Sequence, residues 1–119
     1  MKFLAVFIGG GLGAMSRYAL TTALSGKLGN FPIGTFTANI VGSFFMGVLL
    51  GIFSSRTNET LRLLLTVGFL GGFTTFSSFS AETLTLIRDG QIFSALINIF
   101  ASVGIGLTGC ALGFYLIKN

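Results

Sequence analysis

Four long apolar stretches dominate this sequence of 119 residues. A transmembrane helix needs about 20 consecutive apolar residues, because the hydrocarbon core is about 30 Å thick and each helical residue adds about 1.5 Å. The four stretches cover approximately residues 3–24, 32–53, 61–87 and 92–117. We therefore expect an all-α membrane protein, in which residues 1–119 form a single domain of four transmembrane helices, with Pro32 in the first turn of the second helix.

The composition excludes most other classes of protein. Hydrophobic residues make up 52% of the chain and charged residues 8%, whereas soluble domains average about 25% charged residues. There is no histidine, and the carboxylates are Glu59, Glu82 and Asp89. Hydrolytic triads and side-chain metal sites lack their usual residues, so we expect that the protein is not an enzyme. Apart from Arg17, the basic residues lie near the ends of the stretches, which indicates contact with lipid and not with nucleic acid.

The distribution of Lys and Arg hardly favours one orientation in the membrane. Lys2, Arg56, Arg62 and Lys118 would lie on one side, and Arg17, Lys27 and Arg88 would lie on the other. One interpretation is a weak signal in a protein that still inserts one way. The other is insertion in both orientations, followed by assembly of an antiparallel, dual-topology homodimer.

Small residues at four-residue spacing recur in the stretches. They are Ala5-Gly9-Gly13, Ala38-Gly42, Ser43-Gly47-Gly51, Gly68-Gly72 and Gly109-Gly113. Small side chains let helix backbones approach closely in lipid. The spacing predicts tight helix packing, either within one chain or between two chains.

The third stretch contains a weak helical sequence near its middle. Residues 71–80 combine Gly71-Gly72 with five Ser and Thr residues. Glycine costs about 1 kcal/mol relative to alanine in a helix, and threonine is also unfavourable. We predict a third helix broken near mid-membrane, where non-helical backbone is tolerated only inside protein or beside a wet cavity. The alternative is a kinked but continuous helix whose hydroxyls bond back to its own carbonyls.

Three phenylalanines follow one another at three-residue spacing in this region. Phe73, Phe76 and Phe79 would form a stripe on a helix, which is usually a packing surface. A phenyl ring also has a positive edge, however, and ring edges can face a small anion without binding it too tightly to be released.

Several polar residues lie within the apolar stretches. Asn39 offers two amide N–H donors to an anion, or a hydrogen bond between helices. Arg17 either draws anions into a vestibule or extends to the lipid headgroups. Glu82 either pairs with a basic group or lines a pore mouth. On the fourth helix Asn98 and Ser102 share a face that continues through Gly106 and Cys110. Gly106 has no side-chain polar group, and Cys110 is expected to be an inert thiol, so this face carries little polarity beyond Ser102.

Three sequence blocks together resemble the signatures of the Fluc fluoride channels, also called the CrcB family, and the resemblance extends over essentially the whole chain. The blocks are Gly9-Gly10-Gly11-Leu12-Gly13-Ala14-Met15-Ser16-Arg17-Tyr18, Gly34-Thr35-Phe36-Thr37-Ala38-Asn39-Ile40-Val41-Gly42-Ser43-Phe44 and Gly71-Gly72-Phe73-Thr74-Thr75-Phe76-Ser77-Ser78-Phe79. The resemblance implies a fluoride-selective channel that passively exports fluoride from the cytoplasm across the inner (plasma) membrane and so relieves fluoride toxicity.

The resemblance also implies an assembly and a set of site residues. It implies an antiparallel homodimer with two fluoride pores and a structural sodium ion at the dimer centre. Main-chain carbonyls matching Gly71 and Thr74 would hold the sodium. The family's pore residues match Asn39, Phe76, Phe79, Thr75 and Ser78, and Arg17 is the candidate that draws anions toward them.

Two other functions are consistent with four short helices. Small proton-coupled multidrug exporters have this size, but they resemble one another in using a carboxylate in the first helix, and this chain has none there. The chain could instead be a structural subunit of a larger membrane complex, for which its small-residue contacts would suffice.

Overall fold

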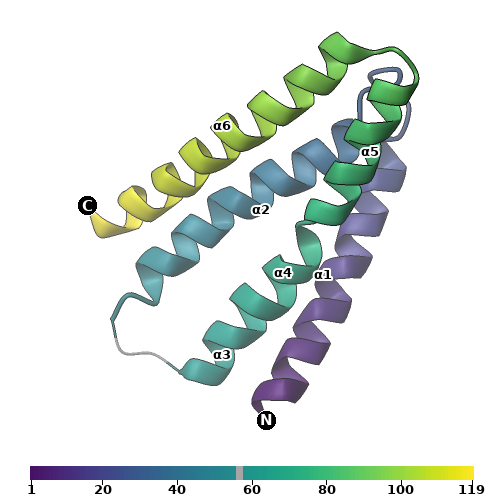
Figure 1. Cartoon of the computed structure of the whole chain (residues 1–119). Coiled ribbons are helices and arrows are strands. Elements are labelled where there is room, and N and C mark those ends of the chain that lie inside the picture. Colours follow the sequence, from purple (N-terminus) through teal and green to yellow (C-terminus); the bar gives the residue numbers. More distant parts are fainter. Residues whose placement is uncertain (56–57) are drawn as a thin grey trace.

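The computed structural model describes residues 1–55 and 58–119, which form helices joined by short connections (Figure 1). The helices are α1 (Lys2–Leu24), α2 (Ile33–Ile52), α3 (Glu59–Leu63), η1 (Leu64–Leu70), α4 (Gly71–Phe73), α5 (Phe76–Arg88) and α6 (Ile92–Lys118). Among the described residues, four helical stretches are long and apolar enough to cross a membrane; they lie where the four spans were expected, and the third of them is Glu59–Arg88. Pro32 is the N-cap of α2, one residue before its first turn. Arg56, which the charge comparison above includes, lies outside the described residues.

The helices pair in a simple pattern. α2 lies beside α6, and α1 lies beside the segment formed by η1 and α4 (Figure 1). Both termini, the end of α2 and the start of α3 lie at one end of the molecule, while the connections that follow α1 and α5 lie at the opposite end (Figure 1). This arrangement is the one that four consecutive membrane crossings require.

The predicted close packing at small residues is confirmed within the chain. A Cβ atom added at Gly47 on α2 would collide with the carbonyl of Cys110 on α6, and one at Gly113 would collide with the carbonyl of Phe44. On the other side of the molecule, a Cβ at Gly13 would collide with the carbonyl of Phe69. These glycines bring the helix backbones together where any larger side chain would hold them apart.

The third span, Glu59–Arg88, is not one regular α-helix. η1 has π-type hydrogen bonding, in which the Gly71 N–H reaches back to the Thr66 carbonyl. After α4, Thr74 (φ −89°, ψ 157°) and Thr75 (φ −153°, ψ 118°) have extended backbone conformations, and α5 begins at Phe76. The extended residues follow the paired glycines after one intervening residue, Phe73, in a stretch where helix propensity is weak.

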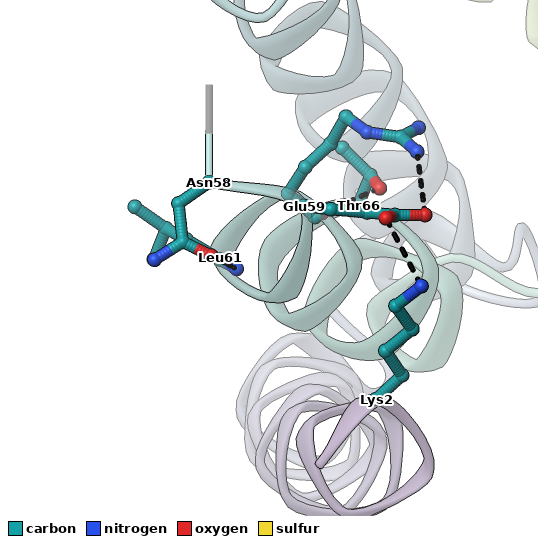
Figure 2. Close-up of polar contacts among 6 residues, drawn as sticks. Lys2, Asn58, Glu59, Leu61 and Thr66 are labelled. Atoms are coloured by element: carbon teal, nitrogen blue, oxygen red, sulfur yellow. Dashed lines mark hydrogen bonds and ion pairs between the residues drawn. The ribbon is translucent and has the colours of Figure 1, made fainter. Parts of the chain in front are cut away.

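Charged side chains connect the start of α1 to the start of α3 (Figure 2). The Lys2 ammonium lies 3.0 Å from one Glu59 carboxylate oxygen, and the Arg62 guanidinium lies 3.9 Å from the other. Asn58 caps α3 by accepting the Leu61 N–H over 3.1 Å. Because the cluster is largely exposed, it contributes to the position of the helix ends more than to stability.

Candidate functional site

The site is built around a contact between Asn39 on α2 and the extended residue Thr75. Asn39 Oδ1 accepts the Thr75 N–H over 2.8 Å, and Asn39 Nδ2 donates to the Thr75 carbonyl over 3.2 Å. One side-chain amide thus binds both backbone polar groups of a residue that has left the helix. Because an unpaired backbone group is costly away from water, this pairing stabilises the extended conformation.

The same region releases two carbonyls from the helical hydrogen-bonding pattern. In a continuous α-helix the Thr75 N–H would donate to the Gly71 carbonyl and the Ser78 N–H to the Thr74 carbonyl. Here the Thr75 N–H donates to Asn39, and the Ser78 N–H donates to Thr75 Oγ1 over 3.1 Å. The oxygens of Gly71 and Thr74 are therefore left without their usual helical donors.

A third contact reaches this region from α1. Arg17 Nε donates to the carbonyl of Gly72 over 3.0 Å, across 55 positions of sequence. The Arg17 side chain is partly buried, and its Nε is directed toward the backbone of the span Glu59–Arg88. Side chains from α1 and α2 thus both bind backbone between Gly71 and Phe76.

Four of the predicted pore residues line one hollow of about 330 Å³, which we call the phenylalanine hollow. Its lining consists of Asn39, Gly42, Ser43, Met46, Thr74, Thr75, Phe76, Phe79, Ser102, Val103 and Cys110. The rings of Phe76 and Phe79 lie 5.7 Å apart between centroids and are tilted by 41°. The hollow therefore combines hydroxyl and amide groups with two adjacent aromatic rings.

The other two predicted pore residues, Arg17 and Ser78, line a second hollow of about 400 Å³, which we call the arginine hollow. It lies among the end of α1, the start of α2 and the end of α5, and it also contains Thr35 and Glu82. Thr35 Oγ1 donates to a Glu82 carboxylate oxygen over 2.6 Å. Glu82 thus pairs with a hydroxyl, where the sequence suggested a basic group as one partner.

Sequence reasoning missed Thr35 and Thr83. Asn98 donates from Nδ2 to Thr83 Oγ1 over 2.9 Å, and Ser102 donates to Asn98 Oδ1 over 3.2 Å. A carboxylate or amide inside a membrane segment requires a polar partner, and this requirement is the signal available in the sequence. It does not identify the partner, because several Ser and Thr residues occur on the facing helices.

Comparisons with known proteins give a consistent picture. The family model described as CrcB-like protein, Camphor Resistance (CrcB), matches residues 4–114. A fluoride-specific ion channel FluC from Novosphingobium aromaticivorans is 49% identical over 96% of this chain and 94% of its own length. Proteins of the same name are 42% identical in Methylobacterium sp. (100% of this chain and 98% of theirs) and 40% identical in Solibacter usitatus (100% of both).

Proposed function

This chain belongs to the CrcB-like family and is a fluoride channel with multiple membrane spans, and we propose that it exports fluoride passively from the cytoplasm through the phenylalanine hollow. In this proposal HF enters the cell across lipid, dissociates near neutral pH and leaves the anion trapped. A selective path down the electrochemical gradient then removes fluoride across the inner membrane without an energy source.

The observation that carries this proposal is the position of the α5 N-terminus. Thr75, the N-cap, and Phe76, the first helical residue, both line the phenylalanine hollow. A helix N-terminus carries a partial positive charge and free N–H groups, which favour an anion. The positive edges of the Phe76 and Phe79 rings act in the same direction. Neither feature is a full charge, so the anion can also leave.

Asn39 has a divided role in this proposal. One of its two amide N–H groups donates to the Thr75 carbonyl, and its oxygen accepts the Thr75 N–H. The second N–H is then the group that donates to fluoride in place of a water molecule. We propose that the anion path also reaches the arginine hollow, so that it is bordered by Thr75 in the phenylalanine hollow and by Ser78 and Arg17 in the arginine hollow.

We propose that the functional unit is an antiparallel, dual-topology homodimer. The Phe76 side chain is 79% exposed in the single chain, although it lines the candidate anion path. An aromatic ring at this position needs protein on its open side for the path to be closed from lipid. A second copy in the opposite orientation supplies that cover, and the nearly equal numbers of basic residues on the two sides support insertion both ways.

We propose further that the interruption of the third helix lies near mid-membrane and forms a structural sodium site. Thr74 and Thr75 fall about halfway along the span Glu59–Arg88. The carbonyls of Gly71 and Thr74 fit a hard monovalent cation, since they are oxygen donors that have lost their helical partners. Bound sodium would supply a positive charge that neutralises these carbonyl dipoles, and two copies would contribute four such oxygens.

The experiment that tests the function is ion efflux from liposomes that contain only the purified full-length chain. We expect rapid release of fluoride after a fluoride gradient is imposed, while liposomes loaded with chloride retain it. Protein-free liposomes are the control. Equal release of both anions, or no fluoride release, would contradict the proposal. Activity of the purified chain alone would also exclude a role as a mere subunit of a larger complex.

A further inference from the structure

The contact between Arg17 and Gly72 assigns the arginine a role that attraction of anions does not explain. A group that only raises the local anion concentration does not need to bind protein. Arg17 Nε nevertheless donates to the Gly72 carbonyl over 3.0 Å, and this oxygen lies between the two candidate sodium ligands in sequence. A hydrogen bond from a guanidinium is charge-assisted and therefore stronger than one from a neutral donor.

The backbone around this contact is closely packed. A Cβ atom added at Gly72 would collide with the carbonyl of Gly10 on α1, and one added at Gly13 would lie 2.9 Å from the Phe73 nitrogen. Glycine on both helices brings α4, which directly precedes the extended residues, against α1, and Arg17 is one helical turn beyond Gly13. The orientation of the Gly72 peptide group is therefore fixed from the α1 side by packing and by a charged donor.

This contact determines which carbonyls remain for a cation. After the helix is interrupted, the Gly72 oxygen is bound by Arg17 and the Thr75 oxygen by Asn39. A carbonyl that accepts a guanidinium N–H is a poor ligand for a second positive charge. The oxygens of Gly71 and Thr74 are not used in this way, because the N–H groups of Thr75 and Ser78 are directed to side chains.

We infer that Arg17 is a positioning residue for the cation site: it holds the Gly72 carbonyl away from the ion and leaves those of Gly71 and Thr74 as ligands. The inference depends on the sodium site proposed above. It differs from an anion-attracting role because it predicts a change in sodium binding, which can be measured without any fluoride flux.

The test measures how sodium concentration raises the thermal unfolding midpoint of the purified full-length protein in detergent, with choline chloride maintaining constant ionic strength. The half-point is the sodium concentration that gives half of the maximal rise in the unfolding midpoint. We expect the half-point to rise about tenfold in Arg17→Met and Arg17→Gln, because one hydrogen bond to a charged group typically contributes about this much affinity. Arg17→Lys keeps the charge and one donor and should recover part of this affinity. Arg88→Met, a change at an exposed arginine at the end of α5, should leave the half-point unchanged.

Two outcomes would overturn the inference. One is half-points in Arg17→Met and Arg17→Gln within twofold of wild type, even if fluoride efflux fell. A wild-type protein that conducts fluoride but shows no response to sodium would overturn the inference and the sodium site, while the channel function would stand.

Discussion

Asn98 on α6 donates from Nδ2 to Thr83 Oγ1 on α5 over 2.9 Å, and the Asn98 side chain is 1% exposed. Thr83 in turn donates to the carbonyl of Phe79 over 2.7 Å, and Ser102 donates to Asn98 Oδ1 over 3.2 Å. A single buried amide therefore joins the helix that carries Phe79 to Ser102, which lines the same hollow.

Replacement of this amide should loosen the contact between α5 and α6. We expect Asn98→Leu to lower the free energy of unfolding by about 1 kcal/mol, because interhelical hydrogen bonds in membranes contribute about 0.6–1.7 kcal/mol each. Thermal unfolding in detergent measures the loss. Thr108→Val, at an exposed hydroxyl on α6, is the matched control and should be close to neutral. Equal stability of Asn98→Leu and the control would show that the network contributes nothing.

Two substitutions at Asn39 distinguish the effects of its two hydrogen bonds with Thr75. Asn39→Asp keeps the acceptor for the Thr75 N–H but loses the donors, so we expect a folded protein with fluoride efflux reduced about tenfold or more, since a negative charge now faces the path. Asn39→Leu loses both bonds and should also destabilise the protein by about 1–3 kcal/mol. Efflux and unfolding are measured on the same preparations. Wild-type flux in Asn39→Asp would contradict the role of the amide donor.

Phe76 and Phe79 are predicted to act through their ring edges. Phe76→Ile and Phe79→Ile keep apolar bulk but remove the positive ring edge that would face the anion, so fluoride efflux should fall at least several-fold. Size-exclusion chromatography should show unchanged assembly. Phe93→Ile, at an exposed ring on α6 that lies outside both hollows, is the control for the loss of an aromatic ring. A fall in efflux of the same size in the control would contradict the assignment.

The close approach of α2 and α6 depends on the absence of a side chain at Gly47. We expect Gly47→Ala to destabilise the protein by about 1–3 kcal/mol, because the added methyl group would collide with the backbone carbonyl of Cys110 and the helices must separate. At Gly104 a Cβ would meet nothing within 4 Å, so Gly104→Ala should be neutral or slightly stabilising. Thermal unfolding of the two variants in parallel checks the difference, and similar midpoints would disprove it.

The sequence alone determined the four spans and the place where helix propensity is weakest. Hydropathy and propensity are local properties, so they could be read along 61–87 and at Gly71-Gly72 without knowledge of any partner. The residues that resemble the fluoride channels likewise lie in short, continuous blocks. The same local reasoning also predicted that glycines such as Gly47 allow helices to touch.

Only the tertiary structure decided what each polar side chain binds. Asn39 contacts Thr75, Arg17 contacts Gly72, and Glu82 accepts a hydrogen bond from Thr35, although each of these pairs is separated by more than 30 positions. It also placed Ser78 in a different hollow from Phe76. These partners depend on how each helix is rotated and how closely it packs against its neighbours. Helix rotation and packing distance are set by contacts between segments that are distant in sequence, so the periodicity of one segment cannot predict them.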